Sequence, residues 1–159
     1  MNLLIVIDVQ KINYNEEVKN YVEKINDLVN SKKFDDVIFT RFINSTDNPV
    51  YTKAKWEDCI EEKDYALAID PHNYKVFDKG TYNSLTTEVK EYIDKNNFDK
   101  IYLCGVDSDC CVLSTALNMF DNNYNVYVLK DYTFSMLSEE NNKLALEIIE
   151  RCIGSDYVI

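Results

Sequence analysis

Gly105-Val106-Asp107-Ser108-Asp109-Cys110-Cys111-Val112 is the stretch of this 159-residue chain that decides the fold. The apolar run at 101–104 before it is typical of a buried strand, and the apolar residues at 112–120 have the spacing of a helix's inner face. Cys111 is therefore expected in the first turn of a helix that follows a strand. The partial positive charge and free N–H groups of a helix N-terminus favour thiolate over thiol. This position predicts a nucleophilic cysteine.

Strands and helices alternate along the rest of the chain. Ser108 and Ser138 are expected to begin helices as N-caps, and Gly154 is expected to end one. The alternation predicts an α/β fold with right-handed crossovers: one three-layer α/β/α Rossmann-like domain spanning 1–159, with a mostly parallel sheet of about six strands. Continuous apolar runs place those strands at 3–7, 37–41, 74–77, 100–104, 126–129 and 157–159, and helical stripes lie at 18–29, 85–93, 112–120 and 144–152.

Composition narrows the classes of function. Seventeen basic and 28 acidic residues give a net charge of −11, which repels phosphate backbones and anionic lipid, so neither nucleic acid nor a membrane is an expected partner. The N-terminus looks like a first strand and not a signal peptide, which predicts a cytoplasmic protein. Five cysteines show no disulfide or zinc spacing. We expect Cys104 and Cys152 to be reduced core residues.

Asp8, Lys79 and Cys111 each follow a predicted strand. Ligands of such sheets bind beyond the carboxyl ends of the strands, so the fold should bring these three residues to one edge. There Lys79 would hold the thiolate by charge, and Asp8 would take the thiol proton and return it to a departing amine. Backbone N–H groups of Asp107 and Cys111 would form an anion hole. The only histidine, His72, lies in an irregular segment and is not expected to act as the base.

Three motifs occur in order along nearly the whole chain: Ile-Asp-Val-Gln at 7–10, Phe-Asp-Lys-Gly-Thr-Tyr-Asn-Ser at 77–84 and the quoted stretch at 105–112. Together they resemble the isochorismatase-like cysteine hydrolase superfamily, which includes nicotinamidase, carbamoylsarcosine amidase and ureidoacrylate hydrolase. The segment Asp-Tyr-Thr-Phe-Ser at 131–135 is similar to that family's pattern after its fifth strand.

The resemblance implies that Asp8 is the base, Lys79 the cation and Cys111 the nucleophile. We expect no cofactor. It also implies attack on an amide-type carbon of a small molecule, loss of ammonia or amine, and hydrolysis of a thioester. A non-proline cis peptide at Val106–Asp107 and a homo-oligomer, dimer or tetramer, are expected on the same ground, with residues 157–159 as an edge that could pair.

The chain departs from that family at three places. Nicotinamidases bind a divalent metal through Asp-x-His and further histidines after the second strand, whereas this chain has Phe42-Ile43-Asn44 there and one histidine in all, so we expect no metal. Asn13 stands where a pocket phenylalanine is common. Asp107 stands where a small or apolar residue is usual, and its carboxylate would oppose an anionic substrate or oxyanion unless it points away. We expect the substrate pocket to be lined by Asn13, Phe42, Trp56 and Tyr82.

Other interpretations compete with amide hydrolysis. A non-catalytic, metabolite-binding member of the fold would account for Asp107 and Asn13. A vinyl-ether hydrolase need not use the cysteine, so it ranks below amide hydrolysis. A dinucleotide-dependent oxidoreductase is disfavoured because no Gly-x-Gly-x-x-Gly follows the first strand. A disulfide between Cys110 and Cys111 would strain the backbone, and Cys110 is instead expected to pack beneath the site.

Overall fold

The computed structural model describes residues 1–159 and contains one five-stranded parallel sheet in the order β3-β2-β1-β4-β5. The strand order reverses direction between β1 and β4, which is the place where ligands bind in such sheets. The strands are β1 Asn2–Ile7, β2 Asp36–Phe42, β3 Lys75–Lys79, β4 Lys100–Gly105 and β5 Val126–Thr133. The longer helices are α1 Lys19–Asn30, α4 Thr87–Asn96, α5 Leu113–Asp121 and α6 Glu139–Ile153, and the short ones are α2 Pro49–Thr52 and α3 Glu62–Tyr65.

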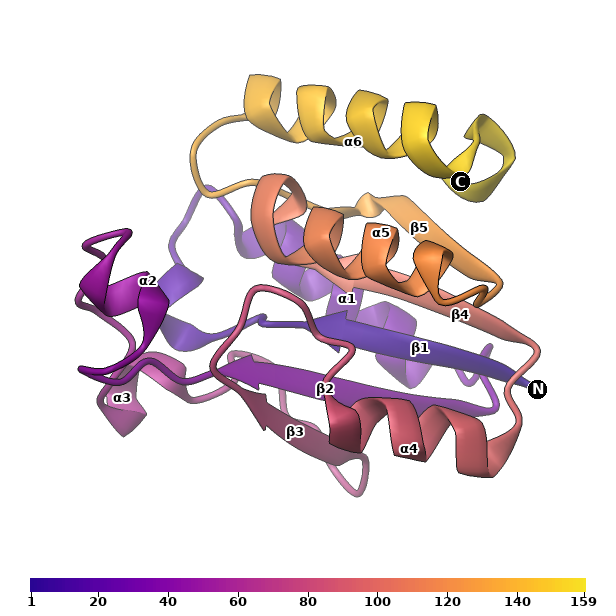
Figure 1. Cartoon of the computed structure of the whole chain (residues 1–159), viewed down its shortest axis with the longest axis horizontal. Coiled ribbons are helices and arrows are strands. Elements are labelled where there is room, and N and C mark those ends of the chain that lie inside the picture. The colour runs from indigo at the N-terminus through magenta and orange to yellow at the C-terminus, as the bar shows by residue number, and fades with distance from the viewer.

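Helices cover both faces of the sheet, so the predicted three layers are present (Figure 1). Side chains alternate along β1, so that Leu3 and Ile5 enter one hydrophobic cluster while Leu4 and Val6 enter the other. The first cluster also takes buried residues of α4, α5 and α6, and the second takes those of α1. None of the helices has the length and apolar composition needed to cross a membrane.

The C-terminal end of the chain differs from the expected sixth strand. Gly154 ends α6 at a φ of 103°, as predicted, but Ser155–Tyr157 then form a 3-10 turn. Only Val158 is left to pair, and it makes a single parallel bridge with Val128 of β5. The sheet therefore has five strands with a one-residue extension.

Two smaller predictions were wrong. Cys152 is exposed on α6, because the buried row of that helix contains Ala145, Ile149 and Ile153. Cys104 is buried as expected. Ser138 caps α6 by accepting from the Asn141 N–H at 3.1 Å. Ser108 caps nothing: it lies inside a π-helical turn, Ser108–Val112, and the residue that precedes this turn is Asp107.

Gly105 brings the ends of β1 and β4 unusually close together. It has a φ of 115°, and a Cβ atom added to it would lie 2.1 Å from the carbonyl oxygen of Ile7. Asp8, the next residue along β1, also has a positive φ, of 50°. Such backbone conformations are costly for residues other than glycine and gather at functional sites.

Candidate active site

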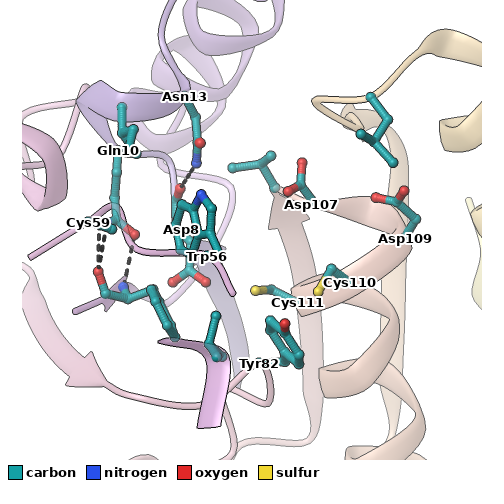
Figure 2. A pocket seen from close by; sticks show the side chains of 15 residues that line it. Asp8, Gln10, Asn13, Trp56, Cys59, Tyr82, Asp107, Asp109, Cys110 and Cys111 are labelled. Carbon is teal, nitrogen blue, oxygen red and sulfur yellow. Dashed lines mark hydrogen bonds between the residues drawn. The ribbon is translucent and has the colours of Figure 1, made fainter. Parts of the chain in front are cut away.

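Asp8, Lys79 and Cys111 meet at the carboxyl edge of the sheet, although they come from distant parts of the sequence. The Lys79 ammonium lies 2.6 Å from the Asp8 carboxylate and 3.8 Å from the Cys111 sulfur. Figure 2 shows the Asp8 carboxylate and the Cys111 sulfur pointing toward one another. Lys79 also donates to the carbonyl oxygens of Thr81, at 2.7 Å, and Tyr82, at 3.2 Å. These partners fix a buried cation between the carboxylate and the sulfur.

A chain of buried hydroxyl groups joins the Asp8 carboxylate to the backbone of Cys111. Thr40 Oγ1 donates to Asp8 Oδ1 at 2.9 Å and lies 3.3 Å from Ser84 Oγ. The Ser84 N–H donates to Thr115 Oγ1 at 2.9 Å, and that hydroxyl donates to the Cys111 carbonyl at 2.7 Å. Thr40, Ser84 and Thr115 are fully buried. The position of the carboxylate is thus set by β2, and the nucleophile's segment is tied to the loop after β3.

The charge state of Cys111 differs from the resting thiolate that its position predicts. A hydrogen bond with Cys110, burial and the Asp8 carboxylate raise the pKa of the Cys111 thiol well above its ordinary value, and they outweigh Lys79. Burial lowers the pKa of Lys79, but the negative charges of Asp8 and Cys111 reverse this effect and raise it overall. These effects favour the thiol form of Cys111, so a base is needed to remove its proton.

The segment after β4 leaves two backbone N–H groups without a carbonyl partner. The Val106–Asp107 peptide is cis, as predicted. The Asp107 N–H donates to no backbone carbonyl, and neither does that of Asp109, because both lie at the start of a helical turn. Free N–H groups at such a position suit an oxyanion.

The Asp107 carboxylate does not point away from the site. It lines the cavity, and its Oδ1 accepts from the Met136 N–H at 2.8 Å. Burial, together with the negative charges of Asp109 and Asp8, raises the pKa of Asp107 to about 6, although the Met136 hydrogen bond lowers it. A second carboxylate, Asp109, lines the same cavity.

The cavity has a volume of about 410 Å³, which is within the usual range for small-molecule sites. All four residues expected to line it do so: Asn13, Phe42, Trp56 and Tyr82. The Phe42 and Trp56 rings lie 5.7 Å apart at one wall. The side chain of Asn13 donates to the carbonyl oxygen of Asp8 at 3.3 Å, so it also holds the strand end in place.

Gln10 is a positioning residue for which the sequence reasoning assigned no role. Its side chain exchanges two hydrogen bonds with the Phe42 backbone, at 2.9 and 2.8 Å, and donates to the Tyr65 carbonyl at 3.0 Å. The signal was present in the motif at 7–10, because a buried amide two residues after Asp8 needs partners. Gln10 thereby holds the aromatic wall against the end of β1.

The other cysteines and the histidine also have clear positions. Cys110 is half-buried in the wall of the cavity, so the prediction that it packs beneath the site was wrong: the π-helical turn directs both neighbouring thiols toward the cavity. No disulfide joins Cys110 to Cys111. His72 is exposed beside Asp70 and does not line the cavity.

The residues after β2 do not fit the divalent metal of nicotinamidases. Asn44 uses its side-chain amide to donate to the carbonyl oxygens of Trp56 and Asp58, at 2.9 and 3.0 Å, which is a structural role. No group of three or more His, Cys, Asp or Glu side chains is arranged to hold a metal ion. We therefore assign no step to a metal.

Comparisons with known proteins agree with this geometry. Residues 2–155 match the family model described as the isochorismatase domain. Isochorismatase family protein 1A of Dictyostelium discoideum is 26% identical over 160 residues, which cover 94% of this chain and 69% of that protein. The pyrazinamidase/nicotinamidase of Streptococcus mutans has the same fold, with a TM-score of 0.83 at 19% identity and 100% of both chains covered. N-carbamoylsarcosine amidase of Thermoplasma acidophilum gives 0.77 at 17% identity, covering 93% of this chain and 92% of that one.

Proposed function

The chain belongs to the isochorismatase family, and from that premise we propose that it is a metal-independent cysteine hydrolase. Its substrate is a small amide, carbamoyl or ureido compound, which it cleaves at a C–N bond. One observation carries the proposal: a single buried ammonium touches both a carboxylate and a thiol in the wall of one cavity. A base, a cation and a nucleophile within mutual reach are the groups that covalent amide hydrolysis requires.

The first half of the reaction forms a thioester. Asp8 takes the proton of the Cys111 thiol as the sulfur attacks the carbonyl carbon, while Lys79 stabilises the negative charge that passes between them. The backbone N–H of Asp107, which has no carbonyl partner, holds the oxyanion of the tetrahedral intermediate together with that of Cys111, the second donor expected from the sequence. Asp8 then gives its proton to the leaving nitrogen, and the C–N bond breaks.

The second half hydrolyses the thioester. Asp8, again a carboxylate, accepts a proton from water as the water oxygen attacks the thioester carbon. The C–S bond breaks and the proton returns to the Cys111 sulfur, which restores the starting state. The balance is one amide and one water consumed, and one acid and one ammonia or amine released.

The raised pKa of the Cys111 thiol supports the role of Asp8 as the base that removes its proton. A resting thiol is inert toward most electrophiles, since the thiolate is the reactive form. The proton must therefore move when the substrate is bound, and Asp8 is the group that faces the sulfur (Figure 2). Two relatives named above are amidases by name, which favours C–N cleavage over the vinyl-ether alternative.

A screen of primary amides and ureido acids for released ammonia tests the proposal, with the Cys111→Ser protein as the control. We expect wild-type release that is unaffected by EDTA, and release close to background from the variant. Mass spectrometry after treatment with an electrophilic amide or aldehyde should find modification at Cys111 that is lost in Asp8→Asn. Binding of a metabolite without release or modification would favour a non-catalytic member of the fold. The single domain, the homo-oligomer and the cytoplasmic location stay predictions.

A further inference from the structure

The cavity carries more negative than positive charge. Among the residues that line it are the carboxylates Asp8, Asp107 and Asp109, and none is Lys, Arg or His. Lys79 lies behind the wall and is paired with Asp8, so those two charges cancel. Neither Asp107 nor Asp109 takes part in a salt bridge. The charge that a ligand meets is therefore that of Asp107 and Asp109, which we call the rim carboxylates.

The hydrogen bonds of the two rim carboxylates leave their charge uncompensated. Asp107 accepts from the Met136 N–H, and Asp109 accepts from the Asn141 side-chain amide at 3.5 Å. Both donors are neutral groups. Both carboxylates lie on the same side of the view in Figure 2 as Cys110 and Cys111, and the negative charge of Asp109 contributes to the raised pKa of Asp107. A cation bound between them would relieve this repulsion, and an anion would add to it.

The aromatic residues of the cavity suit the same kind of ligand. Trp56 and Tyr82 are partly exposed at the cavity and Phe42 lies beside Trp56. Aromatic ring faces attract ammonium groups and tolerate neutral apolar ones, but they offer nothing to a carboxylate. No lining residue supplies the basic side chain that ordinarily binds a carboxylate.

We propose that this cavity selects small amides or ureido compounds that carry a protonated amine, held by Asp107 and Asp109, and that it rejects their carboxylate-bearing analogues. The inference rests on the proposed function, which puts the reacting carbonyl at Cys111 and so leaves the rest of the substrate to face the rim. The ligand site itself is marked by the cavity and its nucleophile, and the carboxylates set which ligand it takes.

Three matched benzamides test the selection, because they differ only in one terminal group. They are 3-(aminomethyl)benzamide, 3-ethylbenzamide and (3-carbamoylphenyl)acetate, and their binding to the unreactive Cys111→Ala protein is measured by calorimetry. We expect the amine to bind about tenfold more tightly than the ethyl compound and the carboxylate about tenfold more weakly, as for a partly desolvated charge pair. Equal affinities, a preference for the carboxylate, or no binding of the amine would overturn the inference.

Substitutions of the rim carboxylates test whether they cause the preference for the amine. Asp107→Asn keeps the acceptor for the Met136 N–H and removes the charge, and Asp109→Asn does the same at its position. In the Cys111→Ala background, each should reduce the preference for the amine at least threefold. Asp121→Asn removes the same charge from the exposed far end of α5 and serves as the matched control. An equal loss in that control would mean that net charge, and not the rim, produces the preference.

Ammonia release from the same compounds by the wild-type protein separates this inference from the proposed function. An amine preference in binding, with no release from these compounds or from the wider screen of amides and ureido acids, would refute hydrolysis and leave the selection standing. Release that is equally fast for all three compounds, with equal binding, would refute the selection and leave hydrolysis standing.

Discussion

The inner end of the cavity and its rim differ in how their charged side chains are paired. At the inner end, Asp8 and Lys79 neutralise each other, Thr40 donates to Asp8, and Lys79 donates to two carbonyl oxygens. At the rim, Asp107 and Asp109 keep their charges, and only neutral donors contact them. The charges of the inner end are thus paired before a substrate binds, whereas those of the rim have no charged partner until a ligand binds. Chemistry and selection are therefore expected to respond to different substitutions.

Loss of the nucleophile is the strongest test of that division. Cys111→Ser should lower the rate of ammonia release by about 10⁴-fold or more, as removal of a nucleophile does in other hydrolases. Because the rim is unchanged, affinity for the substrate should stay within about threefold, since the groups that select it are intact. Cys152→Ser, at an exposed position on α6, is the control and should keep wild-type activity. A variant at Cys111 that retains a tenth of the rate would exclude the covalent route.

Removal of Lys79 should show that the inner end depends on charge pairing for its stability. Lys79→Met leaves the Asp8 carboxylate buried without a partner, which should lower the free energy of unfolding by about 3–5 kcal/mol in urea denaturation. The double variant Asp8→Asn, Lys79→Met should recover part of this loss. Lys143→Met removes an exposed lysine 3.9 Å from Glu147 and should change stability by less than about 1 kcal/mol. Equal effects of the two lysine variants would contradict the importance of the buried pair.

Thr40 tests whether orientation at the inner end contributes beyond charge. Thr40→Val keeps the shape of a fully buried side chain but removes the hydroxyl that donates to Asp8. Loss of a hydrogen bond to a buried carboxylate costs about 1–3 kcal/mol, which predicts roughly a 10- to 100-fold lower kcat. KM should change little, because Thr40 does not line the cavity. Thr40→Ser keeps the hydroxyl and should restore most of the rate. A purely structural role would instead lower stability in both variants and leave the ratio of their kcat values near one.

The rim should show the smallest effect, and with the opposite sign. Burial, with help from Asp109 and Asp8, raises the pKa of Asp107 to about 6 in the folded protein, above that of an unfolded aspartate. The folded state therefore binds the proton more tightly, and stability falls as pH rises from about 4 through 6. Asp107→Asn should remove this loss and stabilise the protein by about 1–2 kcal/mol at pH 7.5, but by little at pH 4. Unfolding curves at the two pH values check this, and a pH-independent effect would contradict it.

The sequence alone predicted the meeting of Asp8, Lys79 and Cys111, because parallel strands share one carboxyl edge and each residue followed an apolar run. Four cavity-lining residues were also predicted: Asn13 at the position where the resemblance places a pocket phenylalanine, and the aromatic residues Phe42, Trp56 and Tyr82. The hydroxyl chain through Thr40, Ser84 and Thr115 was not predicted, because buried hydroxyls are common and only three-dimensional distances reveal a connected set. The raised pKa of Cys111 was missed for a similar reason: the hydrogen bond with Cys110, the burial of the sulfur and its closeness to the Asp8 carboxylate appear only in three dimensions.

Gly105 has a consequence for how this protein can vary. The gap between it and the Ile7 carbonyl admits a hydrogen atom and no carbon. Any side chain there would wedge the two strand ends apart, and with them the base and the nucleophile that each end carries. The spacing of the base and the nucleophile is therefore set by main-chain packing at Gly105 and Ile7. Substitutions at the rim leave the positions of the base and the nucleophile unchanged, whereas replacement of Gly105 would move them apart.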